Sequence, residues 1–160
     1  MRIAVHAVGR MKAGPEKQMA DRYFERFAKA GLAIGLEFAG LTETPESRSR
    51  AVAERKREEA QKARALVAAG TALIVLDERG ANLSSEEFAA RLGGLRDGGR
   101  KAALIAIGGP DGHDPELRAA AELALSFGAA TWPHQLVRVM LAEQLYRAAT
   151  ILSGHPYHRA

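Results

Sequence analysis

Residues 102–112, with the sequence AALIAIGGPDG, constrain the possible folds of this chain more than any other stretch. Residues 102–107 carry no polar side chain, and a short apolar run between turn residues is typical of a strand buried on both faces of a parallel sheet. Gly108 and Gly109 then permit a tight turn, and Asp114-Pro115-Glu116 has the N-cap, the proline and the acidic residue that begin a helix. The stretch predicts a strand, a glycine turn and a helix.

The glycine turn is also a candidate binding site. At the carboxyl end of a buried strand, glycine lets a ligand approach the backbone without interference from a Cβ atom, and ligands of open α/β sheets bind at this edge. A tight strand-to-helix connection without a ligand would show the same sequence pattern. From this stretch alone, a binding site and a simple connection are both open interpretations.

Composition bounds the class of protein. With 160 residues, 47% hydrophobic and 26% charged, the chain fits one soluble domain over residues 1–160. It has no apolar run of membrane-spanning length, and MRIAVHAVGR lacks the features of a signal peptide, which predicts a cytoplasmic protein. The absence of cysteine excludes disulfides and thiol chemistry. A net charge of +4 is compatible with a nucleic-acid partner but does not require one.

Apolar periodicity predicts five strands that alternate with five helices. Besides 102–107, strands are expected at residues 2–8, 32–38, 72–76 and 127–132. Helices are expected from Pro15, over 45–69, after a capping box formed by Ser84 and Glu87, over 115–126 and over 135–153. This alternation predicts an α/β fold with a mostly parallel sheet of five or more strands, flanked by helices.

Two of these helices carry features beyond a core stripe. The helix expected over 45–69 bears a basic cluster that could contact RNA phosphates, although interleaved acids favour a solvated charged face. The cluster consists of Arg48, Arg50, Arg55, Lys56 and Arg57. The helix over 135–153 is apolar on more than one side, which indicates a subunit interface.

The motifs that the chain lacks exclude several classes of binding and catalytic site. The chain has no phosphate-loop lysine motif, dinucleotide fingerprint, nucleophile elbow or zinc-binding H-E-x-x-H. His155 and His158 have a spacing that could chelate a metal on a helix, but Pro156 between them argues against a helix. We therefore expect no metal site.

Three loops remain, at residues 76–80, 108–112 and 127–134, each at the carboxyl end of an expected strand. Neighbouring parallel strands would bring them together in a pocket of backbone polar groups and apolar walls. Such a pocket suits an adenine and a sulfonium better than a polyphosphate, because no lysine is committed to phosphate. The polar tail at residues 155–159 could stack on an extruded base and hold its phosphate, or it could be a disordered terminus.

The chain resembles the RlmH-type ribosomal large-subunit pseudouridine N3-methyltransferases of the SPOUT class. The resemblance covers essentially the whole chain. It is carried by AVGRMK, LIVLDERG, IGGPDG, LALSFGAATWPHQLVRVMLAEQLYRA and the terminal HPYHR. The glycine turn alone is a weak signal, but the set together is specific.

The resemblance implies a deep trefoil knot in the carboxyl-terminal part, S-adenosylmethionine bound in the knot loops, and a homodimer. The cofactor contacts that it implies are Leu76, Gly108, Phe127, Gly128, Ala129, Ala130, Thr131 and Trp132. These residues fall in the three loops identified above. Asp77 and Arg79 receive no role, because they stand where the family's loop varies.

The expected reaction is methylation of N3 of a pseudouridine in large-subunit ribosomal RNA, on the assembled ribosome. His158 is the first candidate for proton acceptor or base orienter and His134 the second, and Tyr157 would pack against the base or ribose. The residues expected to hold RNA backbone are Arg138, His155 and Arg159. The alternatives are a SPOUT enzyme that acts on another RNA, and a non-catalytic RNA-binding or ribosome-associated factor.

Overall fold

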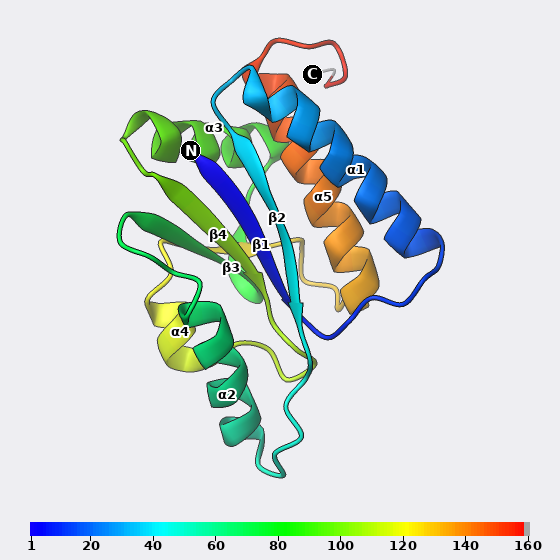
Figure 1. The fold of residues 1–160 in the computed structure, drawn as a ribbon, viewed down its shortest axis with the longest axis vertical. Coiled ribbons are helices and arrows are strands. Elements are labelled where there is room, and N and C mark those ends of the chain that lie inside the picture. Colours follow the sequence, from blue (N-terminus) through cyan, green and yellow to red (C-terminus); the bar gives the residue numbers. More distant parts are fainter. Residues whose placement is uncertain (159–160) are drawn as a thin grey trace.

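Five parallel strands form one sheet in the order β2-β1-β4-β3-β5 (Figure 1). The structure is a computed structural model and describes residues 1–158. The strands are β1 (Arg2–Val8), β2 (Glu37–Thr44), β3 (Thr71–Asn82), β4 (Ala102–Ile107) and β5 (Leu123–Ser126). Every pairing is parallel, so the predicted parallel α/β sheet is confirmed.

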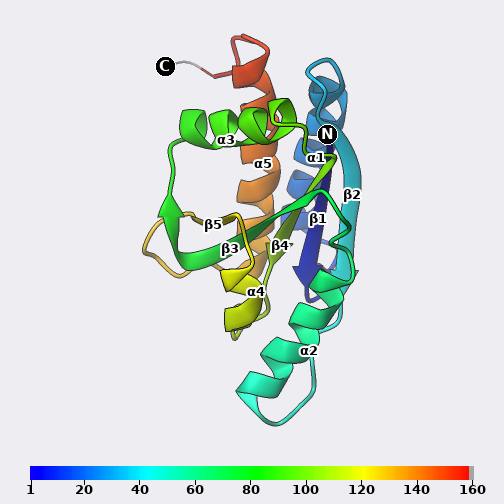
Figure 2. The same cartoon turned by 90° about the vertical axis from the view of Figure 1, so that its left-hand side faces the viewer.

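Helices cover both faces of this sheet (Figures 1 and 2). One face packs against α1 (Pro15–Leu32), α3 (Ser85–Asp97) and α5 (His134–Leu152), and the other against α2 (Val52–Arg64) and α4 (Pro115–Ala119). In β4, Ala103 and Ile105 join the first core, whereas Leu104 and Ala106 join the second. Residues 103–107 are at most 3% exposed. The apolar run at the centre of the sequence is therefore the central strand, buried on both faces as predicted.

The register of the central strands fixes where the loops lie. Ile107 at the end of β4 is paired with Ala7 of β1 and with Leu76 of β3. Since all three strands run in the same direction, the segments that follow them emerge at one edge of the sheet.

The helix-start signals at Ser84 and Asp114 are confirmed. The Ser84 hydroxyl accepts a hydrogen bond from the Glu87 N–H at 3.2 Å, and the Glu87 carboxylate accepts from the Ser84 N–H at 2.7 Å. Asp114 caps α4 by accepting from the N–H groups of Glu116 and Leu117 at 3.1 and 3.2 Å. Such caps satisfy N–H groups that have no partner within the helix.

The strand predicted at 32–38 is wrong in position. α1 continues through Leu32, and β2 begins only at Glu37. A turn at Gly31 separates them, in which the Leu36 N–H donates to the Gly31 carbonyl at 2.8 Å. A Cβ on Gly31 would lie 2.3 Å from the Leu36 carbonyl oxygen, so glycine permits the close approach that ends the helix.

The helix predicted from Thr44-Pro45-Glu46 also begins too early. Thr44 is the last residue of β2, and α2 begins at Val52. The intervening loop is held by Glu58 of α2, whose carboxylate accepts from the hydroxyls of Ser47 and Ser49 at 2.5 and 2.8 Å. These contacts replace the first helical turns that the sequence pattern suggested.

The predictions for residues 115–132 need a similar correction. α4 ends at Ala119, β5 occupies Leu123–Ser126, and residues 127–132, predicted as a strand, form a loop. β5 joins the sheet because Leu125, which is 2% exposed, pairs with Leu76 and enters the core. β3 is longer than predicted, with a register irregularity between Leu76 and Ala81 opposite β5.

The order and pairing of the strands do not show whether one segment of the chain passes through a loop of another, so the trefoil knot stays a prediction.

Within residues 1–158, no helix combines the length and the apolar composition needed to cross a membrane.

The buried side chain of His6 on β1 makes the stability of the fold depend on pH. Its ring is 1% exposed, and Nε2 lies 3.0 Å from the Thr44 hydroxyl. Burial lowers the pKa of His6 from 6.5 to about 4, and the charges of His113, Lys62 and Arg138 act in the same direction. Below pH 6.5 the unfolded chain therefore binds a proton that the folded chain excludes, so stability falls as the pH drops from 6.5 towards 4.

We predict that the free energy of unfolding, measured by urea titration, loses about 2 kcal/mol between pH 7 and pH 5 through His6. The variant His6→Asn should lack this part of the pH dependence, because asparagine does not titrate. His155→Asn, at an exposed histidine, should keep it. Equal pH slopes for wild type and His6→Asn would contradict the assignment.

Candidate functional site

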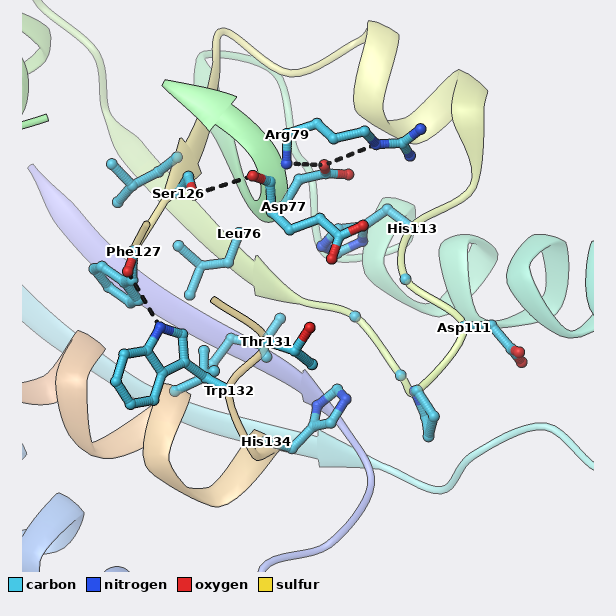
Figure 3. Close-up of a pocket in the computed structure, with 18 of the residues that line it drawn as sticks. Leu76, Asp77, Arg79, Asp111, His113, Ser126, Phe127, Thr131, Trp132 and His134 are labelled. Atoms are coloured by element: carbon cyan, nitrogen blue, oxygen red, sulfur yellow. Dashed lines mark hydrogen bonds and ion pairs between the residues drawn. The ribbon is translucent and has the colours of Figure 1, made fainter. Parts of the chain in front are cut away.

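Three loops enclose a cavity of about 240 Å³ at the carboxyl edge of the sheet (Figure 3). The first is the irregular part of β3 that begins at Leu76, the other two follow β4 and β5, and the first turn of α5 closes the cavity. These are the three loops that the sequence predicted to converge. The lining residues are Lys56, Leu76, Asp77, Glu78, Arg79, residues 107–113, residues 125–128, residues 130–132, His134 and Val137.

The walls are largely apolar, with hydrogen bonds that shape the loop after β5. Leu76, Ile107 and Val137 contribute aliphatic surface. The Trp132 indole N–H donates to the Phe127 carbonyl at 3.2 Å, which folds residues 127–132 back on themselves. The hydroxyl of Ser126 donates to the Glu78 carbonyl at 3.2 Å and joins this loop to the irregular part of β3.

The glycine turn needs its glycines for its own packing. A Cβ on Gly108 would lie 3.2 Å from the Gly112 carbonyl carbon and 3.3 Å from the His113 ring, and one on Gly109 would lie 2.7 Å from a Glu59 carboxylate oxygen. A larger side chain at Gly108 must therefore displace the turn or His113, both of which line the cavity. The sequence analysis explained these glycines by the close approach of a ligand. The structure shows that packing of the turn against His113 and Glu59 also requires them.

Seven of the eight expected cofactor contacts line this cavity; Ala129 does not. The sequence missed Lys56 and His113 as lining residues. His113 directly follows the glycine turn, and this position was a usable signal. Lys56 reaches the cavity only because α2 packs beside the turn, which no local pattern indicates.

Two histidines at the cavity carry ring nitrogens without partners. Within the described residues, His113 Nε2 and His134 Nδ1 are buried and make no hydrogen bond. Burial lowers the pKa of His113 although the charge of Asp77 raises it. Burial, followed by the charge of Arg138, lowers the pKa of His134. Both rings are therefore neutral at neutral pH, and a neutral imidazole can accept a proton or a hydrogen bond.

The predicted tail residues lie outside the cavity lining of their own chain. The Tyr157 hydroxyl donates to Glu143 Oε1 at 3.1 Å. His158 Nε2 lies 2.6 Å from Glu86 Oε1, and its Nδ1 lies 3.3 Å from Arg147 Nη1. His155 is exposed. Arg159 falls outside the described residues.

Arg138, expected to hold RNA backbone, is buried instead. It is 3% exposed, and its guanidinium donates to the carbonyls of Val8 and Gly9 at 3.0 and 2.7 Å and to Glu43 at 2.5 Å. These bonds hold the start of α5 against the ends of β1 and β2. We therefore assign Arg138 a structural role, because its guanidinium is not available to an RNA phosphate.

Comparison with known proteins decides the family. The sequence model of a family described as "Predicted SPOUT methyltransferase" matches residues 1–158. The chain belongs to this family. The resemblance found in the sequence is thereby confirmed, and the family name assigns methyl transfer as its chemistry.

Full-length relatives support the same placement. A Ribosomal RNA large subunit methyltransferase H of Mesorhizobium japonicum is 69% identical over 160 residues, with 100% of both chains covered. The protein of the same name from Brucella anthropi is 60% identical, also with 100% of both chains covered.

A solved structure is more distantly similar to this SPOUT family member. It is the SpoU methyltransferase AviRb from Streptomyces viridochromogenes in complex with AdoMet, 14% identical with a TM-score of 0.41. The match covers 90% of the present chain and 56% of that chain. Among residues 1–158, no group of three or more histidine and acidic side chains is arranged to hold a metal ion.

Proposed function

We propose that this SPOUT methyltransferase transfers a methyl group from S-adenosylmethionine to N3 of a pseudouridine in large-subunit ribosomal RNA. The observation that carries the proposal is the convergence of the irregular part of β3 and the loops after β4 and β5 on one cavity. Relatives named for large-subunit ribosomal RNA, at 60% identity or more over their whole length, support this substrate class. The enzyme, one domain over residues 1–160, would meet ribosomes in the cytoplasm.

The cavity fits the cofactor that this family uses. The aliphatic wall of Leu76, Ile107 and Val137 suits an adenine ring, and the unpartnered nitrogens of His113 and His134 offer polar contacts. When bound, S-adenosylmethionine supplies an electrophilic methyl group on a sulfonium. The chain must then orient the nucleotide and remove the N3 proton.

We propose His134 as the acceptor of the N3 proton in the protomer's own cavity, because it lines the cavity and its lowered pKa keeps it neutral. His158, the first candidate from the sequence, has both ring nitrogens engaged by Glu86 and Arg147. It would have to leave these partners, or act in the cavity of a second protomer.

Single-turnover rates should separate the two histidines. We predict that His134→Ala slows the chemical step at saturating RNA by about 100-fold or more, whereas His158→Ala chiefly weakens RNA binding. Because the pKa of His134 lies below 6.5, the wild-type rate should begin to fall only below pH 6.5, where the ring becomes protonated. A slow chemical step in His158→Ala with a normal rate in His134→Ala would reverse the assignment.

We propose further that the enzyme is a homodimer whose subunits share their sites. Met19 on α1 is 44% exposed and Leu136 on α5 is 39% exposed. Together with Tyr23, Val139 and other residues of α1, α3 and α5, Met19 lines an apolar hollow of about 440 Å³. Phe127 lines both this hollow and the cofactor cavity. We propose that a second copy seated here places its tail beside the cavity.

Mixed dimers test this arrangement. Gly108→Val should distort the cavity while the dimer survives, and His158→Ala should impair the tail. We predict that each homodimer is impaired but that a heterodimer of the two regains activity, because one of its two sites receives an intact cavity and an intact tail. Heterodimers without recovered activity would contradict a shared site.

Methyl-transfer assays on isolated ribosomal RNA, large subunits and whole ribosomes test the proposed function. We predict transfer to N3 of a pseudouridine with assembled ribosomes as the preferred substrate. S-adenosylmethionine should bind saturably in calorimetry and change the emission of Trp132, the single tryptophan, which lines the cavity. No saturable binding would indicate a non-catalytic RNA-binding factor. Transfer to another RNA only would correct the substrate.

A further inference from the structure

Three cations from three different elements line a second hollow beside the cofactor cavity. Lys56 comes from α2, Arg79 from the bulged part of β3 and Arg118 from α4. This basic hollow, of about 410 Å³, shares Lys56, Arg79 and His113 with the lining of the cofactor cavity. No acidic residue is among its described lining residues. The hollow therefore lies directly beside the cofactor cavity.

Asp77, to which the sequence assigned no role, positions two of these cations. Its carboxylate, 7% exposed, accepts from the Arg79 N–H at 2.9 Å and lies 3.6 Å from Arg79 Nε (Figure 3). It also lies 3.3 Å from Arg118 Nε. Arg118 also donates to the Arg79 carbonyl at 3.0 Å. One carboxylate thus orients two guanidinium groups without neutralising both. The Arg79 side chain remains 70% exposed, so its outer N–H groups can reach a ligand.

The third cation is Lys56, and its neighbour in the sequence, Arg55, pairs with the carboxylate of Asp111. The Arg55 guanidinium takes both carboxylate oxygens of Asp111, with Nε–Oδ2 at 2.6 Å and Nη2–Oδ1 at 3.1 Å. It also donates to the carbonyls of Ser49 and Arg50 at 3.1 and 3.0 Å. In the part of the chain that the structure describes, Lys56 makes no ion pair of its own. Lys56 lies close enough to Asp111 for its charge to lower the pKa of that carboxyl, and the Arg55 guanidinium holds the carboxylate by two bonds.

We propose that the basic hollow binds a backbone phosphate of the substrate RNA, next to the nucleotide whose base enters the cavity. This inference rests on the proposed function and deepens it. A phosphodiester is anionic at all physiological pH values and is recognised by the fork of arginine and the point charge of lysine. Phosphate contacts of this kind set the register of a nucleic acid and leave the choice of base to the cavity.

Variants of the cations that leave the fold intact provide the test. Lys56→Gln and Arg79→Gln should each raise KM for the large-subunit substrate by about tenfold and reduce the salt dependence of binding by about one contact. The change should fall on KM and on the salt slope more than on the Kd for S-adenosylmethionine, since the lost contact is a phosphate contact. Lys56→Arg should retain the wild-type KM and salt slope. Lys101→Gln, an exposed lysine directly before β4 at the opposite edge of the sheet, is the matched control.

The role of Arg55 has its own signature. Arg55→Gln should raise KM for RNA, because the released Asp111 carboxylate can pair with Lys56. The double variant Arg55→Gln/Asp111→Asn should restore KM, since it removes the competing charge. A merely structural role of the Arg55–Asp111 pair predicts that the double variant stays as impaired as the single one.

Two readouts separate this inference from the proposed function. Unchanged KM and salt slope in Lys56→Gln and Arg79→Gln, in an enzyme that methylates large-subunit RNA, would overturn the phosphate site alone. A raised Kd for S-adenosylmethionine with unchanged RNA binding would show that the cations bind the cofactor carboxylate instead, which also overturns it. Binding of a ribosomal RNA fragment in the presence of S-adenosylhomocysteine needs no turnover. Weaker binding there by Lys56→Gln would support the site even if the methylated RNA is a different one.

Discussion

Parallel pairing of β4 with β1 on one side and β3 on the other is the constraint on which the rest of the structure depends. Successive side chains of β4 alternate between two cores, as Ile105 and Leu104 show, so both faces of the sheet require helices. Parallel neighbours require crossover connections, and these return the chain to the same edge each time. The irregular part of β3 and the loop after β4 therefore begin side by side, where Leu76 and Ile107 are paired. The cavity is a consequence of this arrangement.

The site is built from groups that also stabilise the fold. Gly108 and Gly109 permit the turn to pack against His113 and Glu59, and the same turn lines the cavity. His113 is buried and neutral at neutral pH, because burial lowers its pKa by more than the charge of Asp77 raises it. Its unpartnered Nε2 is at the same time a possible ligand contact. Substitutions here will affect packing and binding together, so binding and stability must be measured separately for each variant.

Most of the charges around the site are committed to each other. Arg138 joins α5 to Glu43, Asp77 contacts two arginines, and Arg55 takes up Asp111. The basic cluster of the sequence was interpreted chiefly as a solvated face, and the structure divides it. Arg48, Arg50 and Arg57 are exposed, but Arg55 and Lys56 face the glycine turn and the cavity. The net charge of the chain is small, but positive charge is locally in excess at the basic hollow, where we place an RNA phosphate.

The sequence by itself determined the features that depend on neighbours along the chain. The central strand, the caps at Ser84 and Asp114 and the glycine turn were all predicted, because burial on both faces, capping and turn formation leave local patterns. Only the tertiary structure decided which apolar segment joined the sheet next to β3, because that choice depends on the contact of Leu125 with Leu76, residues distant in sequence. It also decided that Arg138 is buried and that the tail packs on α3 and α5, since charge and aromaticity in a sequence do not specify the partner that each side chain finds.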